Sequence, residues 1–283
     1  MGKIVMLTDN GEVAKVWEGG EAYIRTRSQD EYYKKMHQRG CLKDERRFIA
    51  CFNDEIKEVT KQLNNRECGA LLKLVLCMRL GEEGVLRKNK KPMTKGDMRY
   101  VLGVSDRTAT KIINRLMELD IIQAEKTKSK TVYKVNSKYH TMGKEIEKGK
   151  IFTKLFLTAT RDIVELLTIE EIGMFYRMIP HFHYQRYYLV HNPNEPYVEG
   201  AEMKFMSIVE LAGISDLSVP RTRRLIAKLT DIGVLLTIKG CGFTSCVINP
   251  ELISRETVES DWTANLKLMF EDMKGAKNKV IYM

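Results

Sequence analysis

The stretch GVSDRTATKIINRLMELDII (103–122) has a partner further along the chain, GISDLSVPRTRRLIAKLTDIGVL (213–235). Both begin with Gly, a β-branched residue, Ser and Asp, and both continue with apolar residues at helical spacing. Leu235 follows Ile122 by 113 positions, whereas the two opening glycines are 110 positions apart. We interpret the pair as one supersecondary unit used twice, with three extra residues before the second helix of the second copy.

The residues of the first copy predict a helix-turn-helix followed by a hairpin. Thr94 is a good N-cap for a short helix that ends at Gly103, and Ser105 caps the next helix over 106–119. An apolar helix over 70–78 precedes them and is expected to be buried. Two strands, 121–126 and 131–135, with a polar turn between them complete the wing.

The helix over 106–119 has one apolar and one polar face. Ala109, Ile112, Ile113, Leu116 and Leu119 fall at helical spacing and are expected to pack inward. The opposite face combines a cationic stripe with residues that hydrogen-bond to base edges in the major groove. Its candidate DNA contacts are Arg107, Thr108, Thr110, Lys111, Asn114 and Arg115. The wing adds Lys126, Lys128 and Lys130, which suit phosphates or the minor groove.

The second copy repeats this order. A capping box at Thr168–Glu171 opens its first helix, residues 187–190 form a strand, and residues 207–212 form the short helix before Gly213. Ser218 caps its second helix, where the candidate DNA contacts are Arg221, Arg223, Arg224 and Lys228. Its wing, around residues 239–243, is less basic and favours a weaker grip on a DNA backbone.

These residues resemble winged-helix regulators of the MarR type and the RepL-like replication proteins of Gram-positive plasmids and phages. In the first copy, the resemblance rests on the segment from GVSDRT (103–108) to ELDII (118–122) and on the following strand and wing with YKVN (133–136). In the second copy, it rests on IPHFHY (179–184) and NPNEP (192–196). It covers the two copies but not the first sixty residues. It implies a tandem winged-helix fold and either regulation or replication of a mobile element.

Composition agrees with a polyanionic partner. The 283 residues include 47 Lys and Arg against 37 Asp and Glu, a formal charge of +10 and a pI near 9.2. No apolar run is long enough for a membrane span, and the N-terminus lacks the apolar core of a signal peptide. We therefore expect a cytoplasmic protein that does not interact with membranes.

Two segments flank the repeated units. Residues 3–17 form two short runs in which apolar residues alternate with others, on either side of Asp9-Asn10-Gly11, and this pattern is typical of a hairpin. A capping box at Ser28–Glu31 then precedes a basic, aromatic helix. Residues 256–273 predict an amphipathic helix with Trp262, Leu266 and Phe270 on its apolar side. That side either packs on the core or joins two copies in a homodimer.

One motif points to an enzyme. His181-Phe182-His183, with Tyr184, Tyr187 and Tyr188 close behind, has the residue types of a metal-dependent DNA nickase. The triplet falls at the end of a predicted helix, and no separate sheet domain supplies further ligands. We therefore expect no catalytic residue, no metal and no cofactor.

The sequence thus predicts a mainly α fold with small β wings: two tandem winged helix-turn-helix units, an N-terminal hairpin extension and a C-terminal helix. The expected divisions are 1–64, 65–150, 151–254 and 255–283. The expected function is sequence-specific binding of double-stranded DNA as a transcriptional regulator of phage or plasmid type. A replication initiator that binds origin repeats is the alternative, and a second unit that binds a protein partner instead of DNA is the third possibility.

Overall fold

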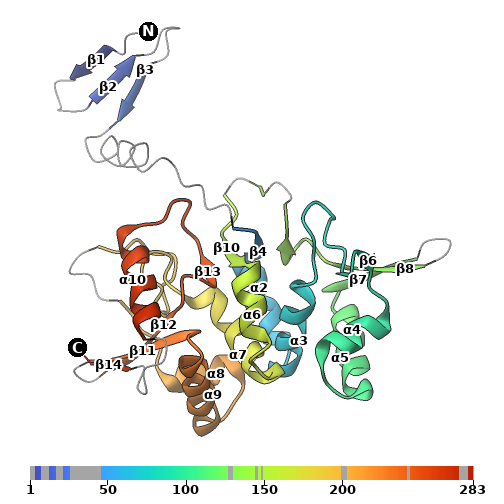
Figure 1. Cartoon of the computed structure of the whole chain (residues 1–283). Coiled ribbons are helices and arrows are strands. Elements are labelled where there is room, and N and C mark those ends of the chain that lie inside the picture. The colour runs from blue at the N-terminus through green and yellow to red at the C-terminus, as the bar shows by residue number, and fades with distance from the viewer. Residues whose placement is uncertain are drawn as a thin grey trace. The chain divides into compact units, whose positions relative to one another are not determined.

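The computed structural model describes residues 4–7, 13–16, 22–25, 46–126, 130–143, 146–147, 149–198, 203–240, 243–273 and 280–282 (Figure 1). The chain divides into two compact units. The first comprises residues 1–45 with 257–259, and the second comprises 46–256 with 260–283.

The first unit contains a small antiparallel sheet. Strand β1 (Ile4–Leu7) pairs with β2 (Val13–Val16), from Ile4 opposite Val16 to Leu7 opposite Val13, where the sequence predicts a hairpin. A third strand, β3 (Ala22–Arg25), which the sequence did not predict, pairs with β2. The Asp9-Asn10-Gly11 turn and the helix predicted after Ser28 lie outside the described residues.

The second unit contains a four-stranded antiparallel sheet in the order β13-β10-β4-β9. Its inner strands are β4 (Phe48–Phe52) and β10 (Phe152–Phe156), and its edges are β9 (His140–Thr141) and β13 (Ile253–Ser254). The prediction of a mainly α fold with small wings is therefore wrong, because this sheet belongs to neither wing and the protein is mixed α/β. Short apolar runs such as FIACF and FTKLF have no period that separates strand from helix, so their pairing was not visible in the sequence.

Each inner strand continues directly into two helices. After β4 come α2 (Asn53–Gln62) and α3 (Asn65–Val75), and after β10 come α6 (Leu157–Val164) and α7 (Ile169–Met178). Capping boxes open both second helices, Asn64 with Glu67 in α3 and the predicted Thr168 with Glu171 in α7. Each strand and cap of the second set follows its equivalent by 104 positions. The repeated unit is therefore longer than the sequence indicated and begins at Phe48.

The two copies are related by an approximate two-fold axis through the sheet. Ala50 in β4 lies opposite Lys154 in β10, and these two positions are themselves equivalent in the two copies. The edge strands pair in the equivalent way in the two copies: Ala50 of the first inner strand lies opposite Thr141, and Lys154 of the second inner strand lies opposite Ser254. An antiparallel pair whose central residues are equivalent is what a two-fold axis requires, so the second unit of the chain has the internal symmetry of a dimer.

Helices α3 and α7 cross on the same axis. A Cβ atom placed on Gly69 would lie 1.8 Å from the backbone oxygen of Ile169, and one placed on Gly173 would lie 1.8 Å from that of Asn65. The two glycines are equivalent in the two copies, and so are Asn65 and Ile169. The helices therefore approach backbone to backbone, and Figure 1 shows them side by side between the pairs α4–α5 and α8–α9.

After the strands and helices that form the central sheet and the α3–α7 crossing, each copy contains a helix-turn-helix and a hairpin. In the first copy these are α4 (Lys95–Leu102), α5 (Asp106–Glu118), β7 (Ile122–Lys126) and β8 (Thr131–Val135). In the second copy they are α8 (Ile208–Ser215), α9 (Val219–Asp231), β11 (Leu235–Gly240) and β12 (Phe243–Ile248). The predicted caps at Thr94 and Ser105 accept hydrogen bonds as expected, and the side chains predicted to pack inward from α5 are buried except Leu119, which is partly buried.

The three-residue insertion predicted before α9 is absent. Helices α8 and α9 follow α4 and α5 by 113 positions at every boundary, so Gly213 lies inside α8 and is not the equivalent of Gly103. The equivalent of Gly103 (φ 65°) is Asp216 (φ 52°), and both residues adopt the left-handed conformation that ends the helix. Aspartate tolerates that conformation better than most residues do, so the second copy keeps the turn without glycine.

This correspondence gives the first prediction. Gly103→Ala is expected to lower the free energy of unfolding by about 1–2 kcal/mol, because a Cβ is strained at this φ, whereas Asp216→Gly is expected to leave it unchanged or raise it. Urea denaturation of both variants measures the difference. Equal destabilisation by the two substitutions would contradict the equivalence.

Between α7 and α8 the second copy differs from the first. The first copy has the short hairpin β5 (Arg87–Lys88) and β6 (Lys91–Pro92) before α4. The second copy has a 3₁₀ turn, η1 (Ile179–His181), followed by a longer connection. The strand predicted at 187–190 consists only of isolated bridges, among them Tyr188 with Val247 and Val190 with Phe205.

The last helix, α10 (Asp261–Asp272), packs on the same chain. Leu266 and Phe270 are buried, and Trp262, Met269 and Met273 pack against the core, which leaves Leu268 as the exposed large apolar side chain of this helix. Dimerisation through this helix stays a prediction. Strand β14 (Val280–Tyr282) then pairs in parallel with β11. Among the described helices, none has the length and apolar character needed to cross a membrane.

Candidate nucleic-acid interface

The polar face of α5 is presented to solvent as predicted. Arg107 and Lys111 are exposed, and within the described part of the chain neither of them forms an ion pair. Thr108 and Thr110 are partly exposed on either side of them. The buried residues on the opposite face of α5 pack into the core, so the cations are carried by a helix that is anchored in the fold.

Asn114 and Arg115 have partners in the free protein. The Oδ1 atom of Asn114 accepts a hydrogen bond of 2.8 Å from Nζ of Lys95, and Arg115 lies 3.5 Å from the carboxylate of Glu118. The Arg115 pair is solvent-exposed, and such pairs contribute at most about 1 kcal/mol, so the guanidinium is available to a stronger acceptor. The contact with Asn114 brings Lys95, the first residue of α4, onto the same face.

Lys95 and Tyr100 were missed at the sequence level. Tyr100 on α4 is 77% exposed, and Nζ of Lys88 lies 3.9 Å from its ring centroid. In a helix-turn-helix the first helix crosses the DNA backbone, so a cation directly after the Thr94 cap and an exposed aromatic on that helix were the available signals.

The polar face of α9 aligns with that of α5 without a gap, so the two faces can be compared position by position. Arg224 and Lys228 follow Lys111 and Arg115 by 113 residues, and Arg221 and Arg223 occupy the positions of Thr108 and Thr110. All four of these basic side chains of α9 are exposed. The position of Asn114 holds Ala227, and that of Arg107 holds Pro220. The two helices therefore share a cationic pair and differ at the positions around it.

The guanidinium of Arg221 is paired with an acidic residue in the free protein. Glu170 at the start of α7 forms ion pairs with Arg221 and, at 2.8 Å, with Nε of Arg66 on α3. Partial burial by itself raises the pKa of Glu170, but the hydrogen bonds from the two arginines lower it overall. The carboxylate therefore stays ionised and links the start of α9 to both crossing helices.

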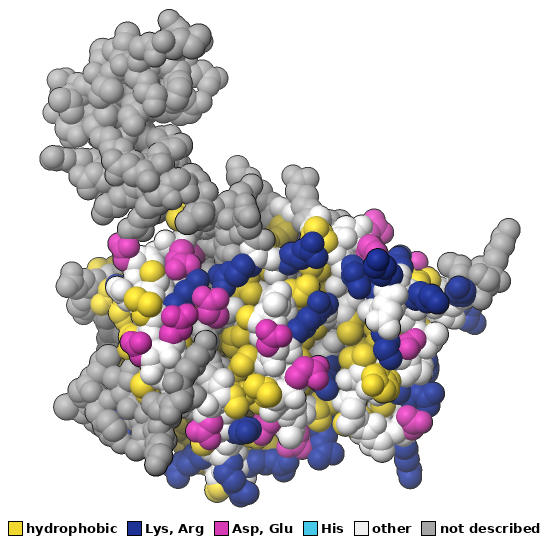
Figure 2. All heavy atoms as spheres, in the orientation of Figure 1, with side chains coloured by type: hydrophobic (Ala, Val, Ile, Leu, Met, Phe, Trp, Pro, Cys, Tyr) yellow, Lys and Arg dark blue, Asp and Glu magenta, His cyan; other side chains and the backbone are white. Residues whose placement is uncertain are grey.

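The hairpins also contribute lysines. Lys126 at the end of β7 is exposed, as is Lys130, while Lys128 lies outside the described residues. Lys239 on β11 is exposed at the position equivalent to Lys126, but the positions of Lys128 and Lys130 hold Cys241 and Phe243, so the second hairpin is the less basic of the two. Figure 2 shows Lys and Arg side chains gathered along the lower edge of the second unit, below α8 and α9, and around α4, α5 and the β7–β8 hairpin.

The His-Phe-His triplet does not form a metal site with described neighbours. His181 lies in η1, and burial, with Lys57 and His191 nearby, lowers its pKa to about 4. His183 stacks on Tyr184 at 5.4 Å and accepts a hydrogen bond from the backbone of Gln185. Tyr187 is buried, with its hydroxyl 3.0 Å from that of Ser254. Among the residues with described positions, no three His, Cys, Asp or Glu side chains are arranged to hold a metal ion.

Comparison with known proteins identifies no relative: no protein-family model, no curated protein and no solved structure matches the chain. The resemblance to MarR-type regulators and RepL-like proteins stays a prediction.

Proposed function

We propose that this protein binds double-stranded DNA in a sequence-specific manner through α5 and α9. The observation that carries the proposal is the matched pair of cations, Lys111 with Arg115 and Arg224 with Lys228, at equivalent positions of two helix-turn-helix segments; Arg115 is partly exposed and the other three are exposed. Long basic side chains on the second helix of such a segment reach guanine edges and phosphates in the major groove. The formal charge of +10 adds a sequence-independent attraction to the polyanion.

The two-fold relation of the copies adds a geometric expectation. Dimeric DNA-binding proteins read inverted half-sites because their two recognition helices are related by a two-fold axis. Here one chain supplies both helices, so a single copy is expected to occupy two half-sites in inverted orientation. Since Asn114 is replaced by Ala227 and Thr108 by Arg221, the two half-sites are expected to differ in base sequence.

Selection from a random duplex library, followed by footprinting with the purified protein, tests this proposal. The expected result is a recovered site with two unequal inverted segments, protected by one protein copy per duplex. Recovery of sequences without any shared motif would contradict sequence-specific binding. A single protected segment would contradict the use of both helices.

The physiological role that we propose is transcriptional regulation, because contact with a specific operator is sufficient for it. A replication initiator would use the same surface, so the residues of α5 and α9 do not separate the two roles. The genomic position of the recovered sites does: isolated sites within promoters favour a regulator, and a cluster of direct repeats at an origin favours an initiator.

A further inference from the structure

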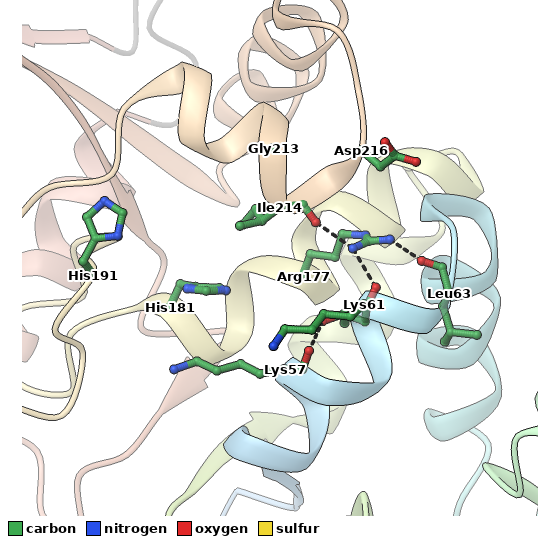
Figure 3. Close-up of a pocket in the computed structure, with 10 residues that line it drawn as sticks. Lys57, Lys61, Leu63, Arg177, His181, His191, Gly213, Ile214 and Asp216 are labelled. Carbon is green, nitrogen blue, oxygen red and sulfur yellow. Dashed lines mark hydrogen bonds between the residues drawn. The ribbon is translucent and has the colours of Figure 1, made fainter.

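A cavity of about 620 Å³ lies beside the second helix-turn-helix, between α2, the end of α7 with η1, and the turn that follows α8 (Figure 3). It is open to solvent. Helix α2 belongs to the first copy of the repeated unit, and the other walls belong to the second copy. The cavity is therefore formed where the two copies meet, next to the start of α9.

The cavity has walls that the first copy lacks. Counted from the caps that open α3 and α7 (Asn64 and Thr168) to the caps Thr94 and Ser207, the second copy has nine more residues than the first. This longer connection supplies His181 and His191 to the cavity wall. His191 lies 2.8 Å from the carboxylate of Glu210 in the first turn of α8, so the connection is tied to the helix-turn-helix itself.

The wall on the α2 side is cationic. Lys57 and Lys61 are one helical turn apart, and Figure 3 shows both ammonium ends projecting into the space below His181. In the described part of the chain neither lysine forms an ion pair. Burial lowers the pKa of Lys57; Asp54 opposes that shift, whereas Arg255 and Lys61 add to it. Two cationic side chains therefore lie together on this wall, and Asp54 of the same helix is the acidic residue that acts on the pKa of Lys57.

The other polar groups leave that charge exposed to a ligand. Asp216 is the acidic residue of the lining, and in Figure 3 its carboxylate lies on the far side of Arg177 from the lysine ends. His181, whose pKa is lowered to about 4 chiefly by burial, is neutral at pH 7 and offers one ring N–H or one acceptor nitrogen. Two ammonium groups beside a neutral donor suit a phosphate group, which carries several strong acceptor oxygens.

Arg177 links this wall to the turn of the second helix-turn-helix. Its buried guanidinium donates hydrogen bonds to the backbone oxygens of Thr60 (2.9 Å) and Leu63 at the end of α2, and of Ile214 (2.6 Å) in α8. A group bound between α2 and the two histidines would therefore contact the end of α2, whose backbone is joined through Arg177 to the end of α8 just before α9.

We infer that this cavity binds the phosphate group of a small phosphorylated molecule, and that occupancy changes the DNA affinity of the second helix-turn-helix. The volume lies within the range of natural small-molecule sites and is sufficient for a ligand of nucleotide size. The second half of the inference rests on the proposed DNA-binding function, whereas the first half does not.

Calorimetric titration of the full chain with inorganic pyrophosphate, in the absence of DNA, tests the first half. Wild type is expected to bind, and Lys57→Gln/Lys61→Gln is expected to bind at least about tenfold more weakly, because two hydrogen bonds to a charged group are lost. Arg79→Gln/Lys138→Gln removes the same charge from exposed positions outside the cavity and is expected to bind like wild type. No binding by wild type, or equal binding by both double variants, overturns the inference.

Measurement of DNA affinity with pyrophosphate, or with chloride at the same ionic strength, tests the second half. Pyrophosphate is expected to change the affinity of wild type by about fivefold or more relative to chloride, and to leave Lys57→Gln/Lys61→Gln unaffected. If the double variant loses DNA affinity while wild type binds no pyrophosphate, the lysines contact the DNA backbone and the inference fails. If pyrophosphate binds as expected but no DNA does, the proposed function fails and the phosphate site stands.

Discussion

Replacement of Lys111 and Arg115 together by alanine is expected to weaken specific DNA binding by about 100-fold or more at fixed salt. Each basic side chain that contacts a base edge contributes about 1–3 kcal/mol, and these two are on one exposed face of α5. Lys111 has no ion pair to lose in the described structure, and the exposed pair of Arg115 with Glu118 is weak. Fluorescence anisotropy with a duplex recovered by selection measures the change.

The matched control is Arg79→Ala/Lys138→Ala, which removes the same formal charge from exposed positions outside α5 and α9. This variant is expected to show only the small loss that follows from reduced overall attraction. A loss equal to that of Lys111→Ala/Arg115→Ala would mean that net charge, and not the face of α5, determines binding.

The corresponding change on α9 separates the two copies. Arg221→Ala/Arg224→Ala is expected to weaken binding as well and to remove protection of one of the two half-sites. Unchanged DNA affinity in this variant would favour the view that the second copy binds a protein partner. In that case the cationic face of α9 would be the surface that contacts the protein partner.

The helix-turn-helix segments could be predicted because the signals that form them are local. Thr94 and Ser105 each satisfy a free amide three residues further on, and Thr168 forms its capping box within the same four residues. The inward face of α5 follows from helical period alone. For the same reason the cations on the opposite face could be assigned without knowledge of the rest of the fold.

The sheet could not be predicted because it joins residues about a hundred positions apart. The run FIACF is equally compatible with a buried strand and with a helix until its partner FTKLF is known. The similarity of Gly-Val-Ser-Asp (103–106) to Gly-Ile-Ser-Asp (213–216) also led to a wrong alignment of the two copies. Backbone geometry, and not residue identity, makes Asp216 the equivalent of Gly103. The phosphate cavity was hidden for a related reason, since Lys57 and His181 meet only through tertiary packing.

Gly69→Ala and Gly173→Ala are each expected to lower the free energy of unfolding by about 3 kcal/mol or more. The added methyl would meet backbone oxygen at 1.8 Å, and backbone cannot move aside as a side chain does, so α3 and α7 must separate. Intrinsic helix propensity acts in the opposite direction, since alanine is favoured over glycine by about 1 kcal/mol within a helix. The observed loss is therefore expected to be smaller than the clash itself, and urea denaturation measures it.

Gly213→Ala in α8 is the control, because the added methyl meets no described atom within 4 Å apart from its chain neighbours and the backbone of its own helix. It is expected to raise the free energy of unfolding by up to about 1 kcal/mol. The double variant Gly69→Ala/Gly173→Ala adds a sharper test. Both substitutions push the same two helices apart, so the second is expected to cost less once the first is present. Simple additivity of the two losses would mean that the glycines act at separate contacts and that the close crossing on the two-fold axis is not what holds the two copies together.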